Sequence, residues 1–512
     1  MKTTTYINKN RPFGATIWHL LTVGFMLIMS GCASQVKNLP EQTKVDIPEK
    51  WEISIKERKK SDDKKVDDAD QSKAVVKNGW LETFNDASLN KFVDVALNNN
   101  PDLLSSATQL KTAIEQVNID GSTLWPNVSA DLTSNRSDNK TSGVTTEIRT
   151  VTGALAISWE ADIWGKLSQR KKSATFSALA QGEIYNAAEL SLVANVSRAW
   201  YNLITNKLQV DLAQQRLDSF KRTAALIDEN YKRGLRSALD VYLSRTDVQL
   251  QISSLSDTQF NYVQSLRAFK TLLGEYPDTN LEFGSSLPEL ENDIPLGLPA
   301  ELLTRRPDLK ASQLQYQAEI ANAKAANRNR YPSISFNGTI GDSREKFNQL
   351  FENNNLVLTL VSGISQPIFQ SGELKSREKQ AIYQAENAYA TLLKSTLSAF
   401  EEVENSISRE SFLQEQHTAL KEAVSFAQGG LELALDRYQS GLVNYTTVLE
   451  SQRRLFDSKR NEINLRNALL QNRIGLHLAL GGDFIDNPDR DSTKNLPSVI
   501  NADANSNVQA TK

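Results

Sequence analysis

The stretch YQSGLVNYTTVLESQ, residues 438–452, interrupts a long helical pattern at Gly441, and the pattern resumes almost at once. An earlier stretch, YKRGLRSALDVYLSR, residues 231–245, does the same at Gly234. Proline is absent from the helical segments before both breaks, about 166–232 and 374–439. At 1.5 Å per residue each segment predicts a helix of roughly 100 Å, far longer than a globular domain needs. The sequence therefore predicts two very long helical hairpins, each with a glycine at its tip.

The two hairpins belong to an internal duplication of the chain. NPDLLSSA at residue 100 returns as RPDLKASQ at residue 306, and WPNVS at residue 125 returns as YPSIS at residue 331. Both landmarks recur 206 residues later, and from there the offset is 207 residues, as between Gly234 and Gly441. A single inserted residue over so long a match indicates two copies of one module, 101–274 and 307–481.

Each copy has the same predicted order of elements. A helix of about 24 residues follows the PDL landmark, then come two strands, the long helix, and a return helix of about 37 residues. The predicted strands are 127–135, 150–161, 333–341 and 354–365. Because the two shorter helices together nearly equal the long one, the simplest packing is a rod. Its strands lie at one end and its glycine breaks at the other.

The strands predict an assembly of several chains. Four strands are too few to close a barrel, which takes about eight or more. Left open, the sheet would expose edge N–H and C=O groups that a bilayer cannot satisfy. Beyond the N-terminal apolar segment, no run of 18 apolar residues could cross a bilayer as a helix. The predicted fold is mainly α with a small β part, in which several chains each contribute four strands to one barrel; three chains would give twelve strands, an ordinary number for an outer-membrane barrel.

Composition excludes several classes of function. The chain has 512 residues and a formal net charge of −3, so it lacks the basic balance typical of a nucleic-acid partner. A single cysteine excludes a disulfide framework. Three histidines lie far apart, at His19, His417 and His477, and spell out neither a metal cluster nor a catalytic triad. The sequence therefore predicts no nucleic-acid binding, no metal, no cofactor and no enzymatic activity.

The N-terminus reads as a targeting segment. Lys2, Lys9 and Arg11 precede the apolar run 13–29, which ends in MSGCAS. Small residues directly before the only cysteine resemble the lipobox of bacterial lipoproteins. That resemblance implies cleavage before Cys32, acylation of its sulfur and sorting to the outer membrane. An ordinary signal peptide, or a membrane anchor with a buried cysteine, is the alternative.

Several stretches together resemble the outer-membrane efflux factor family, also called TolC-like, and its RND-type (NodT-branch) lipoproteins. They include SWEADIWGKL at residue 158, LLTRRPDLKASQ at residue 302 and RYQSGLVNYTTVLESQRRLF at residue 437, and they cover most of 29–482. The resemblance implies a homotrimer anchored in outer-membrane lipid, with most of the chain in the periplasm. Its implied fold is a long α-helical barrel plus a trimeric, twelve-stranded transmembrane β-barrel with four strands per chain. The resemblance also implies two partners, a periplasmic membrane-fusion adaptor and an inner-membrane RND-type pump. The implied function is a passive exit duct for small toxic solutes or drugs.

With this resemblance the chain divides into seven predicted segments. They are a lipoprotein signal peptide (1–31), an acylated linker (32–78), a helical segment of the equatorial region (79–100), repeat 1 (101–274), an inter-repeat connection (275–306), repeat 2 (307–481) and a disordered tail (482–512).

The resemblance also implies a gate at the periplasmic mouth. Gly234 and Gly441 would be the hinges of the two hairpin tips in each chain. Asp240 would bond Tyr438 and hold the tips shut, and Glu450 would contribute to an acidic ring. Each residue has a simpler interpretation: Asp240 caps a helix, Tyr438 packs against the turn, and Glu450 is a solvated acid.

Other positions depart from the family pattern or have a structural role. Thr447 stands where some members have a second acidic residue, and Val443 stands where some have a gating arginine. Arg306 and Asp308 match a family motif and are expected to join the two halves of the chain.

Two other functions remain open at this point. One is the outer-membrane conduit of a type I protein secretion system. The other is a lipid-anchored periplasmic coiled-coil scaffold without a pore, against which the alternating strands argue.

Overall fold

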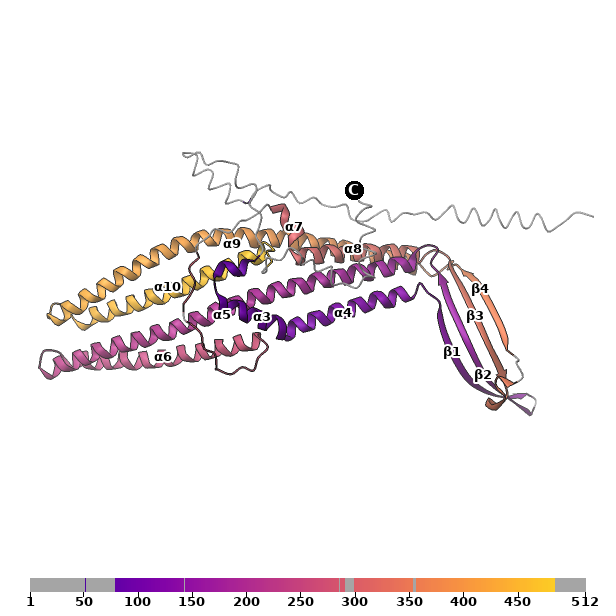
Figure 1. Cartoon of the computed structure of the whole chain (residues 1–512), viewed down its shortest axis with the longest axis horizontal. Helices are drawn as coiled ribbons and strands as arrows, with labels where there is room; N and C mark the ends of the chain where they lie inside the picture. The colour runs from indigo at the N-terminus through magenta and orange to yellow at the C-terminus, as the bar shows by residue number, and fades with distance from the viewer. Residues whose placement is uncertain are drawn as a thin grey trace, which may run out of the picture.

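The computed structural model of the protein describes Trp51 and residues 79–141, 143–284, 286–290, 299–352 and 356–483. Figure 1 shows a thin rod. The elements in chain order are η2 (Trp80–Phe84), α3 (Ala87–Asn99), α4 (Pro101–Ser122), β1 (Asn127–Thr141), β2 (Val144–Ala161), α5 (Lys166–Lys232), α6 (Ala238–Leu272), η3 (Pro299–Glu301), α7 (Leu302–Arg305), α8 (Pro307–Arg328), β3 (Ser333–Arg344), η4 (Phe347–Gln349), β4 (Val357–Ser365), α9 (Glu373–Gln439) and α10 (Tyr445–Ala479). The four strands lie at one end, and the two turns that connect α5 to α6 and α9 to α10 lie at the other.

The duplication is visible in the order of these elements. The series α4, β1, β2, α5, α6 returns as α8, β3, β4, α9, α10. Helices α5 and α9 have 67 residues each, which is about 100 Å of helix as predicted. Helices α4 and α6 pack end to end along α5, and α8 and α10 do the same along α9 (Figure 1). The predicted rod, with strands at one end and turns at the other, is confirmed.

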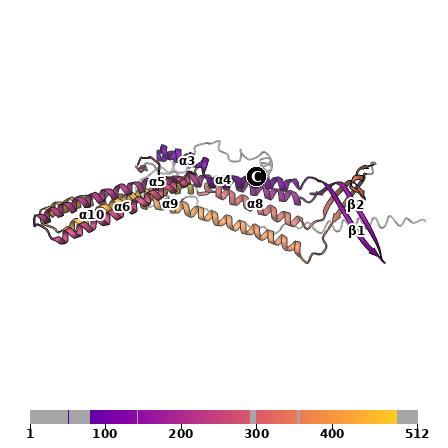
Figure 2. The same cartoon turned by 90° about the horizontal axis from the view of Figure 1, so that it is seen from below.

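The four strands form one antiparallel sheet in the order β1-β2-β3-β4. In both views the sheet continues the rod beyond the helix ends (Figures 1 and 2). The first two strands are longer than predicted, because pairing runs from Asn127 with Ser158 up to Thr141 with Val144. Beyond Leu132 the residues of β1 are polar, so apolar alternation stops although the hydrogen-bonded ladder continues. The prediction that β1 ends at residue 135 was therefore wrong.

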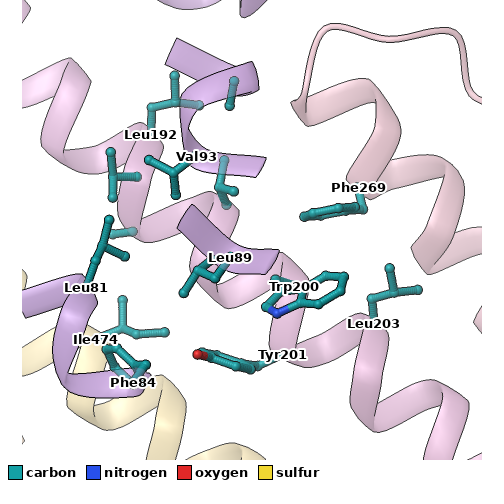
Figure 3. Packing of buried hydrophobic residues seen from close by; sticks show 14 of the residues in the cluster. Leu81, Phe84, Leu89, Val93, Leu192, Trp200, Tyr201, Leu203, Phe269 and Ile474 are labelled. Atoms are coloured by element: carbon teal, nitrogen blue, oxygen red, sulfur yellow. The ribbon is translucent and has the colours of Figure 1, made fainter. Parts of the chain in front are cut away.

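The largest core lies at the middle of the rod, where α3 packs across α5 (Figure 3). Trp200 of α5 is buried against Phe269 of α6, and its indole N–H donates to Asp86 Oδ2 at 2.7 Å. On the other side, Trp80 stacks on His477 of α10, with ring centroids 5.5 Å apart. This core holds the N-terminal segment to both halves of the duplication.

Arg306 connects the start of the second copy to its end. Its guanidinium contacts Asp308 and Glu402, each at 2.8 Å, and also donates to the carbonyl oxygen of Ala479 at 3.2 Å. These contacts join α8, α9 and the C-terminal end of α10. All of these partners lie within the second copy, so the contacts are structural but do not join the two halves of the chain as predicted.

No helix in the described part of the chain combines the length and apolar character that crossing a membrane requires.

Candidate functional site at the hairpin tips and the sheet

Both hairpin tips close with the same backbone motif. Gly234 and Gly441 have φ angles of 72° and 79°, in the left-handed region that favours glycine. The N–H of Leu235 donates to Asn230 O, and that of Leu442 donates to Arg437 O, each at 2.9 Å. This pattern is a Schellman motif, which ends a helix and satisfies its last carbonyl groups. The sequence break thus corresponds to a sharp reversal at each tip.

The next helices start with side-chain caps three residues after each glycine. Ser237 Oγ accepts from the N–H of Asp240 at 3.3 Å, and Asn444 Oδ1 accepts from the N–H of Thr447 at 3.2 Å. These bonds satisfy free donors of the first helical turn. Ser237 therefore supplies the cap of α6, and Asp240 takes part in it through its backbone N–H in the first turn.

The structure brings Asp240 near Tyr438 without a hydrogen bond between their side chains. Tyr438 is fully buried in the last turn of α9, and among the described residues its hydroxyl has no hydrogen-bond partner. Burial raises the pKa of Tyr438; the nearby guanidinium of Arg236 opposes this shift, and the charge of Asp240 adds to it. A direct bond between the two side chains is not formed within one chain.

Arg236 instead makes the contact between the two tips. Its guanidinium lies 4.1 Å from the centroid of the Tyr438 ring, and it also donates to the backbone oxygen of Tyr438. A cation over a tyrosine face is favourable, more so when it is desolvated. This role of Arg236 was not predicted from the sequence. The repeat offset could have found it, because Arg236 is the counterpart of Val443, where an arginine was sought.

A buried polar cluster ties the two hairpins together one turn further from the tips. Tyr445 donates through its hydroxyl to Asp247 Oδ2 at 3.0 Å, and Arg453 approaches Asp247 Oδ1 at 3.3 Å. Tyr445 and Asp247 are both buried. Burial raises the pKa of Tyr445 above its usual range, and the Asp247 charge adds to the effect. This cluster was also not predicted.

A second cross-hairpin contact involves Gln452, which is fully buried in α10. Its amide donates to Thr223 Oγ1 at 2.9 Å and to Ser219 Oγ at 3.1 Å, both on α5. Buried hydrogen bonds of this kind are geometrically demanding, so they fix how α5 and α10 face each other.

The remaining predicted gate residues are found in different surroundings. Glu450 is exposed on α10 and lies 3.8 Å from Arg453, an i,i+3 pair on the same helix. Val443 packs against the apolar cluster of the tips, and Thr447 bonds the capping residue Asn444 through both its N–H and its hydroxyl. Cys32, the predicted acylation site, lies outside the described residues. Within the described ranges no cluster of His, Cys, Asp and Glu could hold a metal ion.

At the opposite end of the rod, the sheet has two chemically different faces. The register places alternate residues of all four strands on a common face. One face carries mostly large apolar side chains, including Val128, Leu132, Leu155, Ile157, Phe336, Ile340, Leu358 and Leu360. The other carries mainly small and polar residues, including Ser129, Thr133, Ala154, Ser158, Asn337, Thr339, Gly341 and Thr359.

Two details support this division into faces. A Cβ placed on Gly338 would contact Ile157 and Leu360 side chains, so these two lie on one face. Trp159 stacks on Phe336 with centroids 5.6 Å apart, at the helix-proximal end of the same apolar face. The apolar side chains are exposed in the single chain. A sheet with one apolar and one polar face is suited to separating a lipid phase from an aqueous one.

Known proteins resemble this chain over most of its length. The toluene efflux pump outer membrane protein TtgF of Pseudomonas putida is 28% identical over 412 residues, which is 79% of this chain and 85% of the relative. The probable outer membrane lipoprotein SilC of Salmonella typhimurium is 25% identical over 470 residues, which is 91% of this chain and 99% of SilC.

The fold is shared with a solved outer-membrane channel. CmeC of Campylobacter jejuni superimposes with a TM-score of 0.76 at 21% identity, covering 84% of this chain and 93% of CmeC. The family model described as outer membrane efflux protein matches residues 92–275 and 298–482. The chain therefore belongs to the outer membrane efflux protein family, the outer-membrane channel components of efflux pumps.

Proposed function

We propose that three copies of this chain form a passive exit duct for small toxic solutes across the periplasm and the outer membrane. Each copy would contribute four strands to a twelve-stranded barrel and its helices to a tunnel below it. The chain would perform no chemistry. The energy would come from an inner-membrane RND-type pump, coupled to the duct through a periplasmic adaptor.

The sheet is the single observation that carries this proposal. Strands β1 and β4 are its two edges, and one of its faces is apolar and exposed. In a bilayer, edge N–H and C=O groups must be paired, and apolar side chains need a lipid-like contact. Pairing β4 of one copy with β1 of the next satisfies the edge N–H and C=O groups. The closed barrel then places its apolar face against lipid. Twelve strands also fall within the usual range of outer-membrane barrels.

The assignments of cargo and anchor use the relatives. TtgF is named for a toluene efflux pump, which favours a small toxic solute as cargo. SilC is named a lipoprotein, which favours acylation at Cys32. Asp240, Tyr438 and Glu450 remain proposed gate residues, with Gly234 and Gly441 as hinges. In the single chain Tyr438 Oη is buried and has no hydrogen-bond partner among the described residues.

Planar-bilayer recording tests the proposal. Purified protein is expected to produce discrete conductance steps, and mild cross-linking of the same sample is expected to give a species of three chains. A second arm measures growth of a strain that lacks the protein in the presence of toluene, with and without a plasmid copy. Absence of conductance would favour the scaffold, and loss of polypeptide secretion without loss of tolerance would favour the type I system.

A further inference from the structure

The half of the rod nearest the tips has two free edges. Helix α5 packs against both α6 and α10, and α10 packs against α9. Along most of this half the four helices follow one another in the order α6, α5, α10, α9, with α6 and α9 outermost (Figure 1). At the tips the start of α6 also meets α10, through Asp247 and Tyr445, and Arg236 just before α6 contacts Tyr438 at the end of α9. In a closed ring of identical chains, the α9 edge of each copy meets the α6 edge of the next.

Helix α6 carries an apolar stripe on the side turned away from α5. Leu239, Tyr242, Leu250 and Phe260 are each more than half exposed. Their spacing of three, eight and ten residues keeps them, together with Thr246, on one face of the helix. The face buried against α5 is a different one and includes Val241, Ser244 and Asp247.

Helix α9 carries a matching stripe beside the face that packs on α10. Phe412, Phe426 and Leu433 are each more than half exposed, and their spacing of 14 and 7 residues is a multiple of a heptad. Gly430 lies on the same stripe between Phe426 and Leu433. A Cβ placed on Gly430 or on the preceding Gly429 would have no described atom within 4 Å outside its own helix turn. The stripe therefore has a gap between two large apolar side chains.

The two stripes match in their distance from the tips. Measured along the helices at 1.5 Å per residue, Leu433 lies about 9 Å from the end of α9 at Gln439, and Tyr242 lies about 6 Å from the start of α6 at Ala238. Phe426 and Leu250 lie at about 20 and 18 Å, and Phe412 and Phe260 at about 41 and 33 Å. Gly430 and Thr246, the small residues of the two stripes, lie at about 14 and 12 Å. Large residues thus face large ones, and the gap faces a small residue.

We infer that α9 of one subunit packs against α6 of its neighbour in this register, with Leu433 beside Tyr242 and Phe426 beside Leu250. Between these two contacts, Gly430 lies opposite Thr246 of the neighbouring subunit, so the two helices can approach each other closely there. The inference rests on the proposed trimer and adds which surfaces meet and at what height.

A second copy of the chain is the occupant that fits both stripes. Each stripe is an exposed apolar surface that costs free energy in water, and one contact between copies covers both at once. A contact between the two stripes explains why their large and small residues agree in height. A different protein bound to one stripe would not explain this agreement. The contact is head-to-tail, so it repeats around a ring and leaves no free edge.

Cysteine cross-linking in the full-length protein in membranes tests this register. The variant Tyr242→Cys with Leu433→Cys is expected to form disulfides between neighbouring chains and to give two-chain and three-chain bands on a non-reducing gel. The mismatched variant Tyr242→Cys with Phe412→Cys places the thiols about 35 Å apart along the rod and is expected to give none. Each single-cysteine variant controls for Cys32.

The outcomes separate this inference from the proposed function. Cross-linking in the matched variant alone supports the register. Equal cross-linking in both variants, or in neither while the wild type still cross-links chemically as a trimer, refutes it and leaves the duct intact. A wild type that is not trimeric refutes the proposed assembly itself.

A side chain placed in the gap gives an independent readout. Gly430→Trp leaves the single chain undisturbed, because an added Cβ meets no described neighbour within 4 Å. It is expected to lower the temperature at which trimers dissociate in detergent. Glu432→Trp, an exposed position off the stripe, serves as the matched control and is expected to leave that temperature unchanged. An equal effect of both variants contradicts the gap contact.

Discussion

The two faces of the sheet can be separated by a pair of adjacent substitutions in β4. Leu360 pairs with Gly338 of β3, and Gly338 pairs with Ile157 of β2, so Leu360 lies near the middle of the apolar face. Thr359, its neighbour in sequence, pairs with Thr339 on the polar face. Leu360→Arg and Thr359→Arg therefore add the same charge to opposite faces at the same height. Both positions are exposed in the single chain, so neither substitution creates a clash within it.

The expected costs differ because only one arginine would enter lipid. An arginine on the lipid face near the bilayer midplane costs about 2–4 kcal/mol, whereas a lumen position tolerates the charge. At about 1.4 kcal/mol per factor of ten, Leu360→Arg should weaken folding into the bilayer by roughly 30- to 700-fold per chain. Thr359→Arg should fold nearly as well as the wild type. It should also change the ion selectivity of the duct, because its charge would line the lumen.

Folding of urea-unfolded protein into phospholipid vesicles measures both variants. The readout is the urea concentration at which half of the protein is not dissociated by SDS when the sample is left unheated. Wild type and both variants are run in parallel. Planar-bilayer selectivity of Thr359→Arg is the second readout. Equal losses in the two variants, or a larger loss for Thr359→Arg, would refute the assignment of the apolar face to lipid.

Other perturbations test the tips, the middle of the rod and the N-terminus. Tyr445→Phe removes the hydroxyl that bonds buried Asp247 and should lower the free energy of unfolding by about 1–3 kcal/mol; a thermal melt equal to wild type would contradict the bond. Burial, with the nearby Arg473 charge, lowers the pKa of His477 to about 3, so the folded state binds fewer protons than the unfolded state, whose histidine pKa is about 6.5. As the pH is lowered from about 6.5 to 3, the free energy of unfolding should therefore decrease by up to about 1.4 kcal/mol per pH unit. The variant His477→Phe should show a smaller decrease in thermal melts across the same pH range. Cys32→Ser should abolish incorporation of radiolabelled palmitate, and retained label would exclude acylation at this position.

The elements of the rod were predictable because their signals are local and repeated. The 67-residue helices follow from two long segments without proline, and the breaks follow from a glycine that can adopt a positive φ. The internal offset then gave each element a second, independent instance. The ends of β1 and β2 were less predictable, because their polar outer parts keep the ladder without any apolar alternation.

The contacts at the tips were harder to predict because they depend on how one hairpin is rotated against the other. Arg236 reaches Tyr438 only because α6 starts beside the end of α9, and neither helix alone encodes that placement. The family pattern directed attention to Asp240, which within one chain takes part in a helix cap. The arginine two residues after the first glycine makes the contact instead.

The differences between the two copies nevertheless contain the missing signal. Asp247 of the first copy corresponds to Arg454 of the second, and Tyr445 of the second corresponds to Ala238 of the first. The acceptor is therefore present only in the first copy and the donor only in the second, so the equivalent pair, Ala238 and Arg454, cannot form the same bond. Positions where polarity diverges between aligned copies, close to a shared landmark, are therefore candidates for a contact between the copies. Asp247 and Tyr445 satisfy this criterion and form the buried bond between the hairpins.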